Sequence, residues 1–224
     1  VSLLTALEEL SMTGMVLDVD LQAMVPTQLA TIEALNYLNF SDCGLIGSIP
    51  RKISTLSTLT SLDLSRNGIG GPVISEFGQM KSLTRLDLAS NHLTGPLPTE
   101  LGSMKSLTRL DLASNHLMGT IPTELGLIKL PDGNGPFEGM KVPTLEVIKL
   151  NQNQLTGTIP TQLALLSKMA SLDLGHNMVD GHSGLPQNQL TGKIPTEIGL
   201  LVEMTDLNLG GNQLSGRIPS ELGR

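Results

Sequence analysis

Aromatic residues and cysteine are both scarce in this sequence. Tryptophan is absent from the 224 residues, aromatic residues make up only 2 %, and cysteine occurs once. A single cysteine excludes a disulfide within the chain. The shortage of aromatic residues removes the side chains that most often anchor tight interfaces. We also find no apolar run long enough to cross a membrane and recognise no signal peptide, so we expect no direct membrane insertion of this segment.

Basic residues are in the minority as well. The chain has 14 Lys and Arg against 21 Asp and Glu, which gives a net charge of −7. Phosphate recognition needs a basic surface, so this balance argues against nucleic acid and anionic membranes as partners. We find no Ser–His–Asp or Cys–His arrangement and no phosphate loop. The sequence therefore predicts a non-catalytic protein without a cofactor.

The sequence does contain a repeat of 24 residues. The segments 80–93 and 104–117 are identical, and both read MKSLTRLDLASNHL. A fixed period of this size is typical of stacked units rather than of a globule with one central core. An asparagine marks most copies of the repeat, and the predicted marker residues are Cys43, Asn67, Asn91, Asn115, Asn153, Asn177 and Asn212.

One copy of the repeat, from Leu107 to Gly126, has the pattern L-x-x-L-x-L-x-x-N-x-L-x-G-x-I-P-x-x-L-G. This pattern resembles the leucine-rich repeat, and its G-x-I-P portion is similar to the plant-type subclass. The resemblance implies an α/β solenoid, a right-handed superhelix with a parallel concave sheet and short 3₁₀ or α turns on the convex side. Independently, the alternation in Leu110-Asp111-Leu112 predicts a half-buried strand.

The repeats predict a single leucine-rich repeat domain over residues 1–224, with about eight repeats, the first degenerate and the last truncated. Breaks in the period predict two insertions, near 130–142 and 178–188. Such loops often give a solenoid its specificity. Because lengthening a surface loop costs little, a neutral insertion is the alternative.

The marker residue is predicted to turn inward at the end of each strand. A buried amide needs hydrogen-bond partners, and the backbones of adjacent turns can supply them as a continuous ladder. Cys43 fits this position because a thiol is small and a weak donor. Beyond the G-x-I-P segment, a hydroxyl residue such as Thr99 is expected to cap the convex turn.

The concave face is the candidate binding surface, because alternate strand residues point to solvent there. Its central column is rich in carboxylates, which could attract a basic partner or a cation. Neighbouring arginines can pair with these carboxylates across strands, so a structural role is the preferred interpretation. The candidate partner-binding residues are Tyr37, Asn39, Asp63, Arg66, Arg85, Asp87, Arg109, Asp111, Lys149, Gln152, Asp173, His176 and Asp206.

Two short segments superficially suggest metal binding. His176, Asp180 and His182 surround the second insertion, but zinc needs three or four ligands in a fixed geometry. Residues 132–135 resemble part of a calcium loop and lack its other spaced oxygens and closing Glu. We therefore predict no metal site in these loops.

Two further sets of residues are predicted to lie on the surface. His92 and His116 occupy the same position in duplicated repeats and are interpreted as a surface column. Threonines near the bend, such as Thr156 and Thr158, leave ice binding as a remote alternative, because regular threonine rows can order water.

The resemblance implies a non-catalytic protein-binding module, similar to plant receptor ectodomains or polygalacturonase-inhibiting proteins. The partner is expected to be a protein or a peptide. The alternative is a structural scaffold or adhesion segment of a larger surface assembly. An extracellular or cell-surface location is expected. The cysteine pairs typical of plant-type terminal caps are missing, which leaves open a partial chain and a cytoplasmic location.

Overall fold

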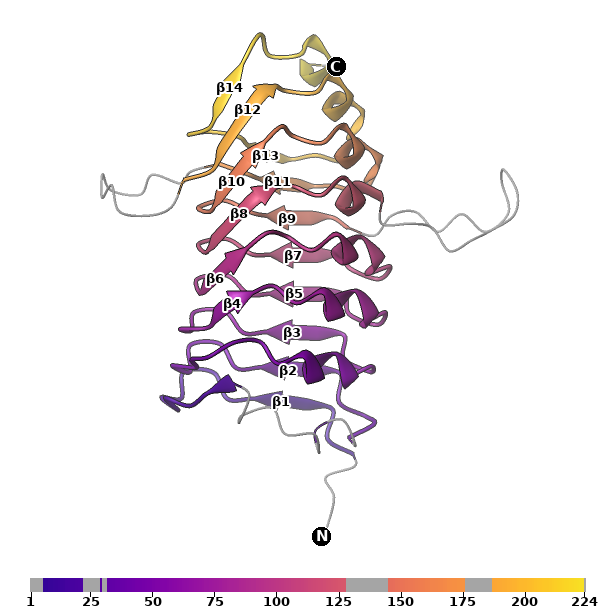
Figure 1. Cartoon of the computed structure of the whole chain (residues 1–224). Coiled ribbons are helices and arrows are strands. Elements are labelled where there is room, and N and C mark those ends of the chain that lie inside the picture. Colours follow the sequence, from indigo (N-terminus) through magenta and orange to yellow (C-terminus); the bar gives the residue numbers. More distant parts are fainter. Residues whose placement is uncertain (1–5, 22–28, 30–31, 128–144, 176–186, 224) are drawn as a thin grey trace, which may run out of the picture.

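A computed structural model describes residues 6–21, 29, 32–127, 145–175 and 187–223 of the chain. The described turns stack into an elongated solenoid with β1 at one end and β14 at the other (Figure 1). Most turns contribute a strand to each of two parallel sheets and a short helix between them. This arrangement confirms the predicted α/β solenoid.

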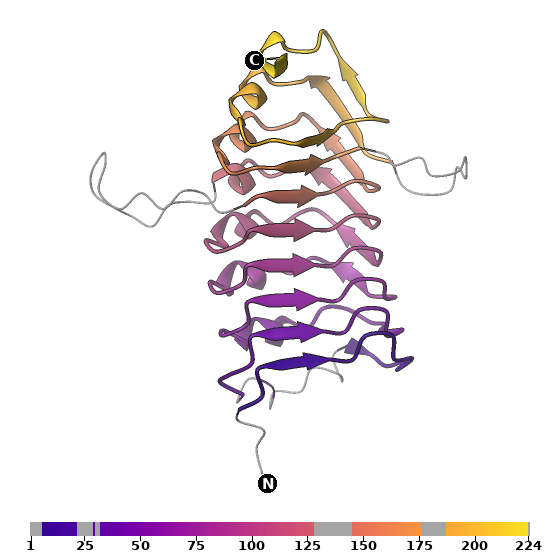
Figure 2. The same cartoon turned by 180° about the vertical axis from the view of Figure 1, so that it is seen from behind.

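The first sheet has eight parallel strands, which lie side by side in Figure 2. Neighbouring strands are in register, so that Leu62 is aligned with Leu86, and Leu86 with Leu110. This is the sheet that the repeat pattern assigns to the concave side. Its strands, in spatial order, are β1 (Glu9–Ser11), β2 (Tyr37–Asn39), β3 (Ser61–Asp63), β5 (Arg85–Asp87), β7 (Arg109–Asp111), β9 (Val147–Lys149), β11 (Ser171–Asp173) and β13 (Asp206–Asn208).

A second parallel sheet of six strands was not predicted from the sequence. Its strands follow the marker residue, where a buried leucine such as Leu117 or Leu155 alternates with exposed neighbours. The strands, in spatial order, are β4 (Gly70–Pro72), β6 (His92–Gly95), β8 (His116–Thr120), β10 (Gln154–Gly157), β12 (Gln189–Lys193) and β14 (Gln213–Ser215).

The helices that connect the second sheet back to the first are 3₁₀ helices in the described turns. The expected hydroxyl cap is wrong: the N-cap is Pro98, which makes no side-chain hydrogen bond, because Thr99 already lies inside the helix. The Thr99 hydroxyl instead donates to Glu100 Oε2 at 3.3 Å. The helices are η2 (Arg51–Thr55), η3 (Ser75–Gln79), η4 (Thr99–Ser103), η5 (Thr123–Leu127), η6 (Thr161–Leu165), η7 (Thr196–Leu200) and η8 (Ser220–Gly223).

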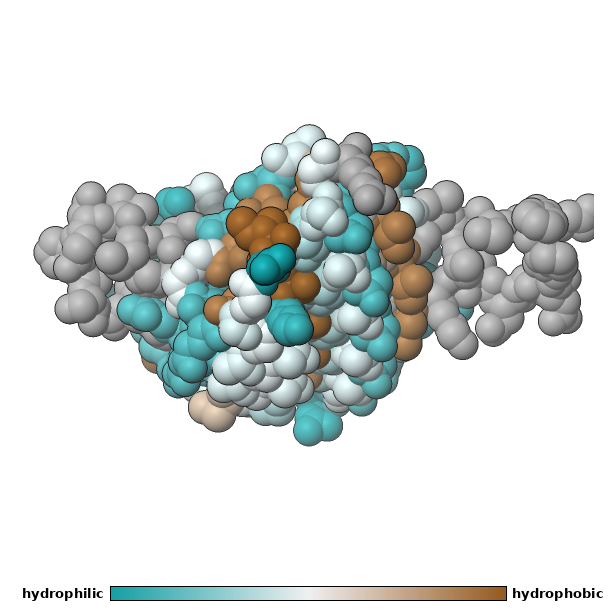
Figure 3. Space-filling view, turned by 90° about the horizontal axis from the view of Figure 1, so that it is seen from above, coloured by the Kyte–Doolittle hydropathy of each residue, from teal (hydrophilic) through white to brown (hydrophobic). Residues whose placement is uncertain are grey.

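The core runs along the whole stack as repeated layers of leucine. Leu62, Leu86 and Leu110 of successive strands are completely buried. At the C-terminal end the equivalent Leu207 is only partly buried, as is Leu214 of the second sheet. Figure 3 views the molecule from this end and shows apolar side chains gathered on the face.

Buried amides join the turns in the predicted ladder. Asn115 is representative: its Oδ1 accepts the Leu93 N–H at 2.9 Å, and its Nδ2 donates to Leu88 O at 3.0 Å. Asn67, Asn91, Asn153 and Asn212 make equivalent bonds. Cys43 occupies the same position, fully buried, and its thiol donates to Met12 O at 2.9 Å.

The ladder corrects one predicted marker residue. The place assigned to Asn177 is filled by Asn188, whose Nδ2 donates to Leu150 O and Leu174 O, each at 2.9 Å. The physical reason is in the spacing: Asn188 stands 24 residues before Asn212 and begins an Asn-Gln-Leu-Thr-Gly segment, as Asn153 does. Consequently the second insertion ends before Asn188. Asn177, His176 and residues 130–142 lie outside the described residues.

Candidate functional site

The carboxylate column of the first sheet has a structural task at the end of each strand. Asp63, Asp87 and Asp111 each accept the backbone N–H two residues further on, at 3.0, 3.2 and 3.3 Å. Asn39, Asp173 and Asn208 do the same in their own turns. A short acidic or amide side chain that bonds its own backbone in this way fixes a turn. The geometry therefore favours the structural interpretation of the column.

Most of the carboxylates lie below the surface. Asp87, Asp111 and Asp173 are only 7, 5 and 8 % exposed. Burial raises the pKa of the Asp87 carboxyl above its ordinary value, and repulsion from Asp111 and Asp63 adds to this rise. These groups offer little charged surface to a partner.

The basic side chains of the same strands are more exposed. Arg85 Nη2 lies 3.2 Å from Asp87 Oδ2 and Arg109 Nη2 lies 3.0 Å from Asp111 Oδ2, while the two arginine side chains are 46 and 29 % exposed. The expected cross-strand pairing is wrong for these two arginines, because residues two apart on one strand point to the same face. Lys149 does pair across strands, with its Nζ 4.0 Å from Asp111 Oδ2, and is 38 % exposed.

Arg66 adds a fourth cation beside this group. It is exposed, its backbone is left-handed with φ of 57°, and it has no ion pair with any residue that the structure describes. A shallow hollow of about 500 Å³ includes Arg66, Arg85 and the three carboxylates Asp63, Asp87 and Asp111 among its lining residues. We call Arg66, Arg85, Arg109 and Lys149 the basic row.

The other candidate residues lie away from the basic row. Tyr37 is half-buried on β2, and its hydroxyl accepts a hydrogen bond from Asn39 Nδ2 at 3.0 Å. Gln152 follows β9 and hydrogen-bonds the Ser114 hydroxyl. Asp206 lies on the last strand, where its Oδ2 accepts from the Ser171 hydroxyl at 2.9 Å. Tyr37 and Asp206 therefore lie toward the two ends of the sheet, whereas Gln152 lies in the turn after Lys149, at the position that Arg66 has in its own turn.

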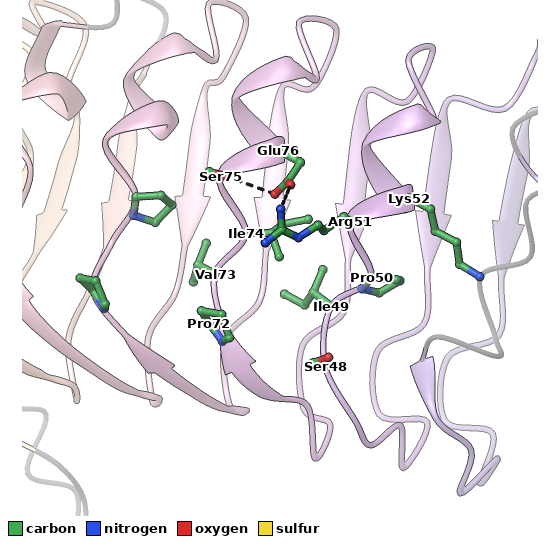
Figure 4. Close-up of a pocket in the computed structure, with 12 residues that line it drawn as sticks. Ser48, Ile49, Pro50, Arg51, Lys52, Pro72, Val73, Ile74, Ser75 and Glu76 are labelled. Carbon is green, nitrogen blue, oxygen red and sulfur yellow. Dashed lines mark hydrogen bonds and ion pairs between the residues drawn. The ribbon is translucent and has the colours of Figure 1, made fainter.

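A groove on the other side of the stack was missed by the sequence analysis. It measures about 740 Å³ and has an apolar floor of residues such as Ile49, Val73 and Ile74. Figure 4 shows an ion pair at its edge, where Arg51 Nη1 lies 2.8 Å from Glu76 Oε1. The groove forms between the segments that precede the 3₁₀ helices in neighbouring turns, and the middle one has Ile74 where its neighbours have Pro50 and Pro98, so a single repeat gives no clear signal of it.

The described part of the chain shows neither a metal-binding cluster of acidic, histidine and cysteine side chains nor a membrane-spanning helix. Among those residues, no group of three or more His, Cys, Asp or Glu is placed to hold a metal. The described helices include none that is long and apolar enough to traverse a bilayer. Cys43 is completely buried, which makes its thiol inaccessible to substrates.

Sequence models of the leucine-rich repeat match residues 34–56, 55–72, 74–117 and 203–224. The chain is a leucine-rich repeat protein. A comparison with curated protein sequences finds no match. Leucine-rich repeat receptor ectodomains are typically non-catalytic.

Solved structures of plant receptors are similar to this leucine-rich repeat chain. The ectodomain of the Arabidopsis receptor kinase HAESA, in complex with an extended IDA peptide hormone, is 30 % identical with a TM-score of 0.75, over 92 % of this chain and 30 % of the receptor chain. The TDR receptor is 29 % identical with a TM-score of 0.75, over 89 % and 30 %. The chain therefore spans about a third of the receptor chains that it matches.

A plant ice-binding protein is also similar, at 26 % identity and a TM-score of 0.58, over 92 % of this chain and 72 % of that protein. The same leucine-rich repeat fold thus occurs in proteins with different tasks. The choice between those tasks depends on the surface residues of this chain.

Proposed function

We propose that this leucine-rich repeat chain is a non-catalytic module that holds a protein or peptide partner on the outer face of its first sheet, through the basic row. The observation that carries the proposal is the unequal exposure of opposite charges. The side chains of Asp87 and Asp111 are 10 and 8 % exposed, whereas the side chains of Arg85, Arg109 and Lys149 are between 29 and 46 % exposed.

The similar receptor structures support the same kind of role. HAESA is bound to a peptide hormone in one structure and to the hormone with a co-receptor in another. These are ectodomains, so our proposal includes an extracellular or cell-surface location for this chain. The receptor chains are about three times longer, and the identity of the partner is a separate question.

The charge distribution favours an acidic partner segment. The Asp87 and Asp111 carboxylates are already committed to backbone N–H groups and to the arginines, so the most exposed charged side chains of β5, β7 and β9 are cationic. Although the whole chain carries a net charge of −7, surface charges beyond about 8 Å are largely screened at physiological ionic strength. The local basic row therefore outweighs the distant acidic residues when a partner docks. We expect the partner to place Asp or Glu side chains against Arg85 and Arg109.

A peptide selection tests this proposal. A random peptide display library is selected on the wild-type chain, and the recovered peptides are compared by affinity. We expect enrichment in Asp and Glu, and at least a tenfold loss of affinity in the Arg85→Gln/Arg109→Gln variant, because each charged contact contributes about 1 kcal/mol or more. Neutral glutamines are preferred over reversed charges because Asp87 and Asp111 lie directly beside them.

The matched control is Lys193→Gln/Arg217→Gln, which removes two exposed positive charges away from the first sheet, one at the end of β12 and one just after β14. This variant should retain affinity. Equal losses in both variants would mean that only net charge matters. Recovery of no peptide, or peptides indifferent to Arg85 and Arg109, would contradict the proposal and favour the scaffold alternative.

Ice binding is the second candidate. Thr94, Thr156 and Thr191 occupy equivalent exposed positions on the second sheet, and an ice-binding protein is among the similar structures. Met118 and Ser215 interrupt this row at the same position. A thermal-hysteresis measurement tests this candidate, and the absence of thermal hysteresis would exclude ice binding.

A further inference from the structure

The carboxylate column of the first sheet is interrupted at β9. In the turns of β2, β3, β5, β7, β11 and β13, an Asp or Asn side chain accepts the backbone N–H two residues further on. β9 carries Lys149 at this position, and an ammonium group can only donate. The backbone N–H of Asn151 therefore lacks the acceptor that the equivalent N–H groups have.

The side chain of Asn151 is unpaired as well. Asn151 is only 6 % exposed, and its Oδ1 is buried without a hydrogen bond to any residue that the structure describes. Buried polar atoms are normally paired, so an exception requires a physical explanation. The fold does not require an amide here, because other turns carry Ala89, Ala113 or Gly175 at the equivalent position. Asn151 therefore combines an unused donor with an unused acceptor.

Another unpaired atom lies on the neighbouring strand. Arg109 Nε is buried without a hydrogen bond, although Arg109 Nη2 pairs with Asp111. β7, which carries Arg109, is adjacent to β9 in the first sheet (Figure 1). The unpaired atoms thus occur on neighbouring turns, on the face that carries the basic row. Their position associates them with the partner rather than with the folding of the chain.

Small side chains give a partner access to Asn151. Ala113 occupies the equivalent position in the adjacent turn, and Ala89 the one before it. Ala89 also lines the hollow that includes Arg66 and Arg85. Because neighbouring turns are about 4.8 Å apart, Asn151 is about 10 Å from Ala89, or about three residues of an extended chain. A peptide that occupies the hollow can therefore reach Asn151 across the two alanines.

We propose that Asn151 determines partner specificity by binding the backbone of a peptide in extended conformation. The Asn151 N–H donates to the C=O of one peptide residue, and Oδ1, turned outward by rotation of the side chain, accepts the N–H of the same residue. These two groups point to the same side in an extended chain, as they do between paired strands, whereas a helix uses them internally. The inference rests on the proposed function and narrows the partner to an extended peptide segment.

Methylation of the peptide backbone tests this inference. Peptides selected on the wild-type chain are resynthesised with one backbone nitrogen methylated at a time, and calorimetry measures their affinity for the wild type and for Asn151→Ala. We expect one methylated position to lower affinity for the wild type by about tenfold or more and to have no further effect in Asn151→Ala, because both changes remove the same hydrogen bond. The absence of any methylated position whose effect depends on Asn151 would overturn the inference.

Protein stability separates a binding role of Asn151 from a structural one. Asn151→Ala introduces the residue found at Ala89 and Ala113 and removes an unpaired buried acceptor, so its urea midpoint should equal or exceed that of the wild type. Asn153→Ala removes buried bonds of the ladder, including the one from Asn153 Nδ2 to Leu112 O, and its midpoint should fall. A similar fall in both variants would assign the Asn151 amide to the fold and refute its binding role.

Two comparisons separate this binding role from that of the basic row. Gln154→Ala removes an amide from the second sheet in the same turn and should retain peptide affinity. Peptides that depend on Arg85 and Arg109 but not on Asn151 would refute the role of Asn151 alone. Peptides that depend on Asn151 but not on the two arginines would refute the basic row alone, and recovery of no peptide would contradict both.

Discussion

At the scale of single residues, we expect substitution of a buried ladder asparagine to lower the free energy of unfolding most. Asn115 is 1 % exposed, accepts the Leu93 N–H, and donates to the carbonyls of Leu88 and Leu112. Asn115→Ala leaves the Leu93 N–H buried without its partner, whereas Leu88 O and Leu112 O each keep one bond, from Asn91 Nδ2 and Asn153 Nδ2. Because the unsatisfied N–H costs about 1–3 kcal/mol and each of the two other lost bonds about 1 kcal/mol, we expect a total loss of about 3–5 kcal/mol. Urea unfolding measures it.

Asn212→Ala is the control for this prediction. Asn212 makes the same type of bonds to Leu190 and Leu174, but it is only partly buried in the last described turn. Water can replace its bonds there, so the loss should be about 1 kcal/mol. Similar losses at Asn115 and Asn212 would show that burial does not set the energy of the ladder.

The buried carboxyl of Asp87 predicts a pH dependence of stability. Burial and the neighbouring Asp111 and Asp63 raise its pKa above the ordinary 3.8, although the Ala89 N–H and Arg85 oppose this rise. The folded state therefore binds the proton more tightly, and stability falls as pH rises from 3.8 through the raised pKa. Above that window the ionised group remains unfavourable.

Asp87→Asn removes this penalty, and asparagine already occupies the same column at Asn39 and Asn208. Relative to wild type, the variant should gain stability as pH rises from about 3.5 to 7, because only the wild type acquires a buried charge at residue 87. Urea unfolding at several pH values measures the difference. A difference that stays constant or declines with pH would contradict the expected direction.

At the scale of the elements, successive 3₁₀ helices pack closely where they contain a glycine, as η3, η4, η5 and η7 do. A Cβ at Gly102 would lie 2.2 Å from Glu124 O of the next helix. Gly102→Ala must push two backbones apart, and we expect a loss of about 2–3 kcal/mol. Gly223→Ala is the control, since a Cβ there would meet nothing within 4 Å. Thermal unfolding of the two variants should differ clearly, and equal midpoints would contradict the packing argument.

The elements also show how far the sequence could predict the fold. The strands of the first sheet follow from the L-x-L alternation, and the ladder follows from the period, because buried amides recur at one fixed place. The sequence analysis assigned Asn177 to the ladder in place of Asn188, because it placed the insertion after the marker residue instead of before it. The second sheet escaped prediction because most of its strands contain only one buried leucine, such as Leu117 or Leu155, which is too short a pattern to show an alternation.

The sequence could predict which residues share the face of the candidate site, but it could not predict which of their side chains are exposed. Sequence alternation places Arg85 and Asp87 on one face, but it does not show that the longer side chain reaches solvent while the shorter one bonds its own backbone. The stacking of the His92 and His116 rings and the groove floored by Ile49 and Val73 depend on contacts between turns. Such contacts depend on how neighbouring turns are offset from each other, and the sequence of a single repeat carries no information about that offset.

At the scale of the whole molecule, the stack has no central core, and its stability is distributed along its length. An internal turn packs against two neighbours, whereas a terminal turn packs against one. The leucines reflect this difference: Leu110 of β7 is completely buried, and Leu207 of β13 is only partly buried. We therefore expect the turns at the ends of the 224-residue chain to unfold locally while the middle turns stay folded.

Two equivalent hydrogen bonds allow a direct comparison of the middle with the end. The Arg109 N–H donates to Thr84 O at 3.0 Å, and the Asp206 N–H donates to Ala170 O at 3.1 Å. Since the bonds are alike, hydrogen exchange at the two amides differs through the opening of the surrounding turns. We expect the Asp206 amide to exchange about 100-fold faster than the Arg109 amide, in proportion to a difference of about 2.7 kcal/mol in opening free energy. Hydrogen exchange followed by NMR measures both, and equal protection would mean that the stack opens as one cooperative unit.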